Sequence, residues 1–371
     1  KSFYWQARGT WDRTRTYITK LNVPAFTTGG GTSQGTGNFF YMTDDKRRAC
    51  LPGETGHLPG EAGFNPGEAR PNCTGLPLNR YGNMYARVFF KSCDQLQVDL
   101  RSRCGEGKDF QVNDEGWLVW VGAGNSWKDG VTKNLWQTRL PATEATNPWG
   151  YELSWGHPIV DRPLCPANVP GPTCQPGAGV GINQIIGNVF PEFRFSISND
   201  FSYKKFTLYA LLDATIGNSI NNQGEGWGLL SVSSAQFDQA KKTVETSKPV
   251  GYSWRAGGPE STGTGGFYDV LGPNNYVVEK GSFAKFRELS ATYRVGPIAK
   301  VGDWTVGIVG RNIATFTGYS GYDPEVGCGG RDGSGCGGAG AGSTGSGLIN
   351  QTDAFSFPTL RTWTFTLSTR F

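Results

Sequence analysis

The chain has 371 residues, of which 55 are Gly and 13% are aromatic, and its formal net charge is +4. Gly favours turns, loops and close backbone approaches over helices, so this composition indicates an all-β chain. No run of about 18 apolar residues occurs, which excludes a transmembrane helix, and the small, evenly spread charge argues against nucleic acid as a partner.

Six segments alternate apolar and polar residues, as β-strands do. In chain order, residues 193–201 and 206–216 are expected to form a hairpin with a tight turn at 202–205, and 286–295 and 304–310 a second hairpin around 296–303. The predicted strands are 1–19, 193–201, 206–216, 286–295, 304–310 and 362–371.

The last strand, TWTFTLSTRF, separates its side chains by face. One face carries Trp363, Phe365, Leu367, Thr369 and Phe371, and the other carries Thr, Ser and Arg. The first set is either the core face of a soluble sheet or the lipid face of an outer-membrane barrel with a wet lumen. Loop lengths favour the barrel, because turns at 202–205 and 296–303 are short whereas loops at about 216–283 and 316–356 are long.

Residues 21–186 have a different character from the rest. They are rich in Pro, Gly and Trp and hold only short strand-like runs, at 84–90 and 117–122. We interpret them as one large extracellular excursion between a barrel strand in 1–20 and the C-terminal barrel strands and loops in 187–371. The alternative is that the two short runs are further barrel strands.

The eight cysteines lie in loop-like sequence, which indicates disulfides and an oxidising compartment. Pairing of sequence neighbours is one of several possible connectivities. Zinc-type knuckles are absent, so no metal site is expected. The disulfide candidates are Cys50 and Cys73, Cys93 and Cys104, Cys165 and Cys174, and Cys328 and Cys336.

Catalytic chemistry finds little support in the sequence. The two histidines, His57 and His157, stand in no Ser-His-Asp or Cys-His arrangement, and no carboxylate pair suited to glycoside hydrolysis is convincing. We therefore expect no enzyme activity and no cofactor. A better candidate ligand site is a crowd of aromatic rings, although these rings could equally pack a loop poor in aliphatic residues. They are Trp117, Trp120, Trp127, Trp136, Trp149 and Trp155.

Three segments near the C-terminus carry a family pattern: GSFAKFRELSATY from 281, GRNIATFTGYSGYDPE from 310, and FPTLRT from 357, followed by a final Phe. In this order and spacing they resemble the C-terminal strands of SusC/RagA-like TonB-dependent outer-membrane receptors. The motif residues, for which we expect a structural role, are Gly310, Arg311, Asn312, Tyr319, Gly321, Asp323, Pro324 and Glu325. Arg311 is a candidate ion-pair partner for the two carboxylates at the barrel rim.

The resemblance implies a fold and partners. The fold is the C-terminal part of a large antiparallel transmembrane β-barrel with long extracellular loops, here a partial barrel without its plug, in the bacterial outer membrane. The implied partners are a SusD-like lipoprotein lid, the TonB complex, the barrel-assembly machinery, the lipid bilayer, and the remaining strands or other copies that close the sheet. The barrel-assembly signal would be Trp363, Phe365, Leu367 and Phe371.

The expected function is therefore that of part of a TonB-dependent transporter for oligosaccharide or peptide nutrients. Two alternatives stay open. The chain could be a barrel-derived structural or adhesive surface protein that self-assembles, or a fragment of the transporter. A secreted carbohydrate-active β-sandwich enzyme is a third possibility, without a supporting site.

Overall fold

The structure is a computed structural model. It describes residues 3–23, 26–28, 39–42, 44, 76–77, 79–96, 98–129, 133, 135, 138–149, 152–159, 183–230, 235, 238, 240–243, 275, 277–298, 301–325, 352–353 and 358–370. Among these residues, no helix has the length and apolar character needed to cross a membrane.

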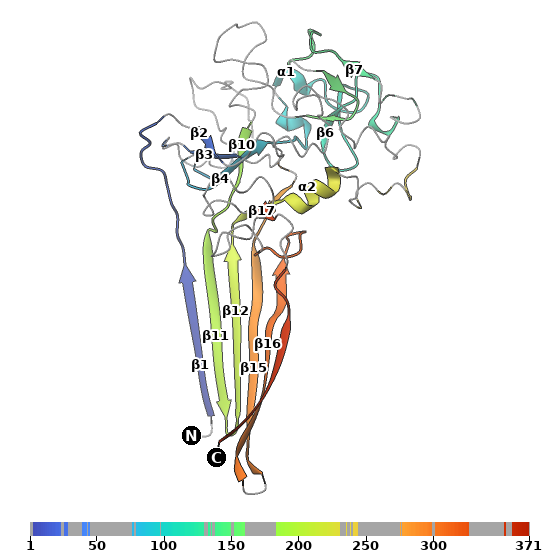
Figure 1. Cartoon of the computed structure of the whole chain (residues 1–371). Helices are drawn as coiled ribbons and strands as arrows, with labels where there is room; N and C mark the ends of the chain where they lie inside the picture. The colour runs from blue at the N-terminus through green and yellow to red at the C-terminus, as the bar shows by residue number, and fades with distance from the viewer. Residues whose placement is uncertain are drawn as a thin grey trace.

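One long antiparallel sheet dominates the structure, and it contains all six predicted strands (Figure 1). This confirms the all-β, antiparallel prediction. In spatial order the strands are β1 (Phe3–Asp12), β11 (Phe193–Tyr203), β12 (Phe206–Ile216), β15 (Phe283–Ile298), β16 (Val301–Thr317) and β18 (Thr362–Arg370).

Several strand limits differ from the prediction, since β11 continues to Tyr203, β15 already begins at Phe283 and β16 continues to Thr317. β1 ends at Asp12, short of residue 19, because the chain then leaves the sheet and Tyr17 bridges Arg80 instead. The expected turn at 296–303 is wrong, since β15 continues to Ile298 and β16 already begins at Val301. Gly296 and Gly302, with φ of 96° and 61°, allow the backbone to stay paired through this region.

The two faces of the sheet differ in chemistry. Residues directly opposite each other in an antiparallel pair share a face, so the register assigns every paired side chain. The apolar face includes Phe3, Trp5, Trp11, Phe195, Ile197, Phe201, Leu208, Leu212, Leu289, Val306, Ile308, Trp363, Phe365 and Leu367. The polar face includes Gln6, Thr10, Arg194, Ser196, Ser198, Asp213, Lys285, Ser290, Thr292, Thr305, Thr362, Thr364 and Thr366.

The apolar face is not covered by a second layer of the described chain. Trp5 is 62%, Trp11 66% and Phe365 78% exposed. A soluble sheet would bury such a row against another element. The exposed row therefore contradicts a β-sandwich in which these rings form a core.

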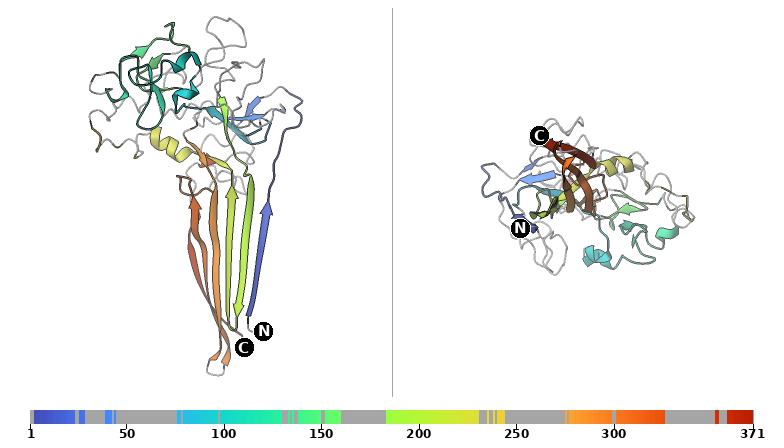
Figure 2. Two further views of the ribbon diagram at one scale, coloured as in Figure 1. Left: turned by 180° about the vertical axis from the view of Figure 1, so that it is seen from behind. Right: turned by 90° about the horizontal axis from the view of Figure 1, so that it is seen from below.

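The sheet is open. In the described part of the chain, β1 pairs with β11 alone and β18 with β16 alone, so both outer strands have a free edge. The two chain termini lie at the same end of the sheet (Figures 1 and 2). Because the sheet has an even number of antiparallel strands, its two edge strands run in opposite directions.

The other elements gather at the far end of the sheet (Figure 1). One small sheet has the order β10-β4-β3-β2, and another has the order β14-β13-β17 beside helix α2. Their bounds are β2 (Phe26–Thr28), β3 (Phe39–Met42), β4 (Asn83–Arg87), β10 (Asn183–Asn188), β13 (Ser219–Asn222), α2 (Gln223–Leu230), β14 (Val278–Lys280) and β17 (Thr352–Asp353).

The described residues within 89–159 form a compact unit of short elements, which we call the head unit. A core of Phe110, Leu118, Trp149 and Leu153, all at most 1% exposed, holds it together. Its elements are η1 (Cys93–Gln95), α1 (Val98–Arg101), β5 (Phe110–Val112), β6 (Leu118–Trp120), η2 (Trp127–Asp129), β7 (Arg139–Leu140), β8 (Leu153–Ser154) and β9 (His157–Pro158). β4 and β6, which overlap the two short runs noted in the sequence, pair within the small sheets rather than the long one.

Candidate functional site

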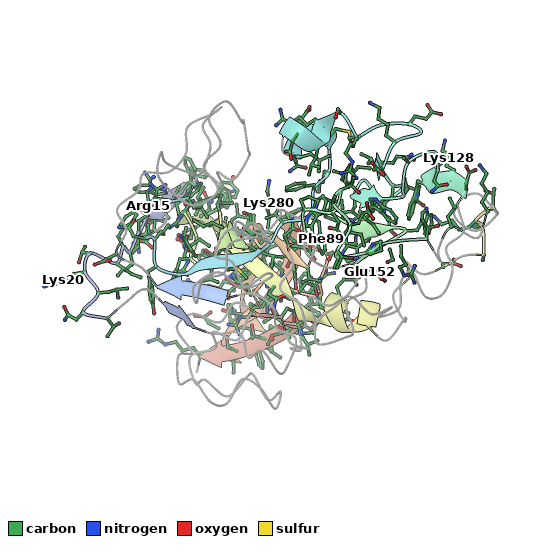
Figure 3. All side chains as sticks on the ribbon, turned by 90° about the horizontal axis from the view of Figure 1, so that it is seen from above. Arg15, Lys20, Phe89, Lys128, Glu152 and Lys280 are labelled. Carbon is green, nitrogen blue, oxygen red and sulfur yellow. A yellow bond between two sulfur atoms is a disulfide. The ribbon has the colours of Figure 1, made fainter. Side chains whose placement is uncertain are left out.

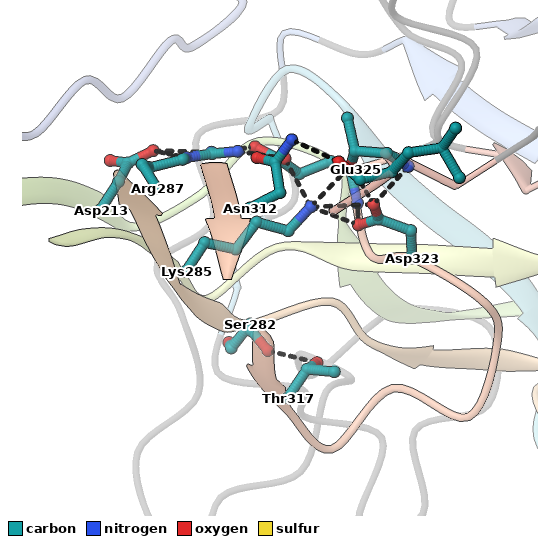
Figure 4. A network of polar contacts seen from close by, with 10 residues as sticks. Asp213, Ser282, Lys285, Arg287, Asn312, Thr317, Asp323 and Glu325 are labelled. Atoms are coloured by element: carbon teal, nitrogen blue, oxygen red, sulfur yellow. Dashed lines mark hydrogen bonds and ion pairs between the residues drawn. The ribbon is translucent and has the colours of Figure 1, made fainter. Parts of the chain in front are cut away.

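A buried ion cluster lies on the polar face where the long sheet meets the small ones (Figure 4). Lys285, in β15, is only 1% exposed, and its Nζ lies 2.6 Å from Asp323 Oδ1 and 2.7 Å from Glu325 Oε2. The same ammonium donates to Thr359 Oγ1 at 3.2 Å. Buried charges are tolerated when they are paired and hydrogen-bonded, and Lys285 has four acceptor atoms within reach.

Arg287 extends this cluster towards β12. Its guanidinium donates to Asp213 Oδ2 at 2.7 Å and to Glu325 Oε2 at 2.6 Å. Strict alternation would place residues 287 and 288 on opposite faces. A β-bulge between Phe286 and Glu288 breaks the alternation, so Glu288 lies on the polar face together with Lys285 and Arg287.

Asn312 lies on β16, directly across from the bulge in β15. It has φ of 51°, a left-handed conformation that Asn tolerates better than most residues. Its side-chain amide donates to the Leu360 carbonyl at 3.1 Å. The expected pairing of Arg311 with the two motif carboxylates is wrong, since Arg311 Nε donates to Glu288 across the strands at 3.1 Å.

Hydrogen bonds from the segment after β16 connect it to the small sheet β14-β13-β17. Tyr319 is buried, and its hydroxyl donates to Asp353 Oδ2 in β17 at 2.8 Å. A side chain at Gly321 would collide with the Tyr319 ring, 2.4 Å from the nearest atom, so the motif needs glycine there. Ser320 donates to Glu279 in β14 through both its amide and its hydroxyl.

The carboxylates of the cluster have lowered pKa values. Burial alone would raise the pKa of Asp323, but hydrogen bonds from Lys285 and Thr359 outweigh it and lower the pKa below 3.8. For Glu325 burial is likewise outweighed, by Arg287 and Lys285, and its pKa falls below 4.5. Both groups are therefore charged near neutral pH. Tyr319 is the reverse case, because burial and the nearby Asp353 carboxylate raise its pKa.

A second ion cluster, not anticipated from the sequence, lies at the β1 side of the sheet. Glu192 accepts from both Arg15 and Arg80, and Arg80 is 2% exposed. Glu192 also approaches Gly217 so closely that a Cβ there would lie 2.6 Å from its side chain. The cluster joins three segments that are far apart in sequence, which is why no local pattern indicated it.

Most of the predicted tryptophan site lies inside the head unit. Trp127 and Trp155 stack with ring centroids 4.5 Å apart, and both are buried, as are Trp120 and Trp149. Trp117 is partly buried, with Phe89 against its edge and the Lys91 ammonium over its ring at 4.7 Å. Burial of four rings favours the packing alternative. Trp136 lies outside the described residues.

The head unit also contains a disulfide bond. Cys93 and Cys104 form a disulfide, one of the pairs of sequence neighbours. The other six candidate cysteines lie outside the described residues.

Figure 3, viewed from above, shows Phe89, Lys128 and Glu152 within the head unit and Arg15 and Lys20 on the opposite side of the molecule.

The terminal strand places Trp363, Phe365 and Leu367 side by side on the exposed apolar face, and Phe371 and Phe357 lie outside the described residues. The described residues contain no group of three or more His, Cys, Asp or Glu suited to a metal ion. The contacts of the motif residues thus hold chain segments together. None of these contacts pairs a nucleophile with a general base.

Comparison with known proteins gives one informative sequence match. No family model matches the chain. TonB-dependent receptor P3 of Formosa agariphila is 30% identical over 155 residues, which are 38% of this chain and 14% of that protein. The match confirms the resemblance to TonB-dependent receptors. The chain spans only 14% of the relative's length.

Solved structures give weaker likenesses. The RagAB peptide importer in its closed-closed state aligns with a TM-score of 0.42 and 14% identity, covering 87% of this chain and 25% of that one. A second structure of the RagAB peptide transporter aligns with a TM-score of 0.41 at the same identity and coverage.

Proposed function

We propose that this chain is the C-terminal wall of a TonB-dependent outer-membrane transporter that imports oligosaccharide or peptide fragments. The observation that carries the proposal is the long sheet, which exposes Trp, Phe and Leu on one face and Thr, Ser and charged residues on the other. β11 and β12 have 11 residues each, and about 9–11 residues suffice for a tilted strand to cross a bilayer.

In this proposal the apolar face contacts lipid and the polar face contacts water inside the barrel. Residues 21–186 and the long segments after β12 and β16 stand on the extracellular side, where the disulfide can form. The protein performs no chemistry on its substrate. It works with a SusD-like lipoprotein lid, draws energy from the TonB complex, and is inserted by the barrel-assembly machinery through its last strand.

The face assignment is tested by two neighbouring substitutions on β18. Phe365→Asp places a carboxylate on the lipid side, whereas Thr364→Asp places the same group on the wet side. Charged groups within the lipid band are destabilising, so Phe365→Asp should lower the amount of folded protein in the outer membrane severalfold. Equal recovery of the two variants would overturn the proposal.

Transport itself is tested in cells by uptake of labelled oligosaccharides and peptides. Deletion of the gene, or collapse of the proton gradient, should abolish uptake of one substrate class. Uptake that is unchanged in the deletion strain would rule out this role in import.

The two free edges favour a second candidate, a surface protein that closes its sheet with further copies of itself. β1 and β18 run in opposite directions, so β18 of one copy could pair antiparallel with β1 of the next. A native mass equal to a multiple of this chain would support assembly. A mass matching a single longer polypeptide that contains this chain would exclude it.

A further inference from the structure

The terminal strand does not define its own register. β18 reads TWTFTLSTR, with a small hydroxyl residue at nearly every second position and a large apolar residue between. Sliding it by two residues along β16 would keep Trp, Phe and Leu on the apolar face and Thr or Ser on the polar face. A pattern that survives such a shift specifies register weakly.

Contacts inside the strand discriminate poorly between these registers. Gly307 lies opposite Thr366, but Thr364 or Ser368 would offer a similar hydroxyl after a shift. Gly310 lies opposite Trp363, whose ring occupies the space of the missing Cβ. After a shift in one direction, the aromatic ring of Phe365 would take that place.

The segment just before β18 is held much more specifically. The Thr359 amide donates to Asp323 Oδ2 at 3.2 Å, and its hydroxyl contacts both Asp323 and Lys285. One residue later, the Leu360 carbonyl accepts from Asn312 Nδ2. A shift of two residues would move Thr359 by about 6.5 Å along the strand, which breaks all of these contacts.

We infer that the Lys285 cluster and Asn312 act as a register stop for the terminal strand. Lys285 lies in β15, the strand next to β16. The stop therefore fixes the position of β18 relative to β15 as well as to β16. Asp323, on the segment leaving β16, and Thr359, on the segment entering β18, meet on one ammonium. The stop thereby fixes which backbone groups β18 presents at its free edge to the next strand.

The inference is tested by disulfide cross-linking in the complete protein. Val306→Cys is combined with Leu367→Cys, its native partner, or with Phe365→Cys or Thr369→Cys, the partners after a shift in either direction. Diagonal neighbours lie about 7–8 Å apart, too far for a disulfide, so the shifted pairs report slippage. In the parent background, only the 306–367 pair should link efficiently.

The stop is then weakened by Thr359→Val with Asn312→Gly, which removes the side-chain contacts while glycine retains the left-handed backbone. Linkage of the shifted pairs should rise roughly tenfold. Thr364→Val, on the polar face within β18, is the matched control and should leave linkage at the parental level. Parental linkage in the weakened protein, with the 306–367 pair still forming, would overturn the inference.

Should the double variant yield no folded protein, Thr359→Val alone decides by the same criterion, since it removes only the hydroxyl contacts. The readout is cross-link position and not transport. A failure of this inference is therefore distinguishable from a failure of the proposed import function.

Discussion

Lys285 and Asp323 are 38 residues apart in the chain, yet they form a buried ion pair in which the ammonium contacts both carboxylate oxygens, at 2.6 and 2.9 Å. One partner comes from β15 and the other from the segment that follows β16. The pair ties the rim of the sheet to the chain that leaves it.

Removal of this ammonium should be costly. Lys285→Met leaves Asp323 buried without its counter-charge, and breaking a buried pair in this way typically costs about 3–5 kcal/mol of stability. Arg311→Met breaks a pair whose arginine side chain is 62% exposed and should cost at most about 1 kcal/mol. Urea unfolding of the two variants in detergent provides the comparison, and equal losses would show that the Lys285 cluster contributes little.

Acid should release the same cluster. The folded pKa values of Asp323 and Glu325 lie below their ordinary values of 3.8 and 4.5, so their stabilisation is complete above about pH 5 and is lost as the pH falls through the folded values. The charged groups facing them are Lys285 and Arg287, with Asp213 beyond. Stability measured from pH 7 to 3 should fall less steeply in Asp323→Asn than in the parent. Parallel curves would contradict the assignment.

The close approach of Trp363 to Gly310 predicts a sharp position effect among glycines. An added Cβ at Gly310 would lie 2.6 Å from the Trp363 ring, so Gly310→Ala should cost about 1–3 kcal/mol through overpacking. Gly9 lies on the same face with nothing within 4 Å of the equivalent position, and Gly9→Ala serves as the control. Stability losses of equal size at both sites would show that ring contact is not the cause.

The disulfide should stabilise the head unit locally. Cys93 and Cys104 close a short loop, and in the chain-entropy description such a bond contributes about 2–4 kcal/mol. Cys93→Ser with Cys104→Ser should therefore speed proteolysis within residues 89–159. Neither cysteine belongs to a strand of the long sheet, whose resistance to heat in detergent should be unchanged. Loss of both properties together would mean that the two parts unfold as one.

Alternation in the sequence was sufficient to predict the long sheet, because period-two patterns such as FRFSIS translate directly into two faces. It failed at 296–303, where glycines let pairing continue through a stretch that resembles a turn. The alternation pattern also did not predict the bulge at Arg287. This single extra residue reverses the face on which each later residue of β15 lies. Asp213 carried a usable signal, as a lone charge in the apolar strand FTLYALLDATI.

The residues that the motif contacts were harder to predict from the sequence than the motif itself. Arg311 is nearer in sequence to Glu325 than Lys285 is, yet the strand register gives Arg311 to Glu288. Thr359 stands outside every alternating segment, and its contact with Asp323 depends on where two irregular segments return to the sheet. The same holds for Arg15, Arg80 and Glu192, which meet through the geometry of three separate connections.

The free edges of β1 and β18 have a practical consequence for handling the protein. Among the described residues, neither edge has a partner strand for its outer backbone groups, and exposed aromatic rings lie beside both, a combination that templates uncontrolled strand addition. A preparation of residues 1–371 in plain buffer is thus expected to precipitate, and detergent would shield the rings but not the edges. Refolding work would succeed better with a short complementary strand supplied as a peptide.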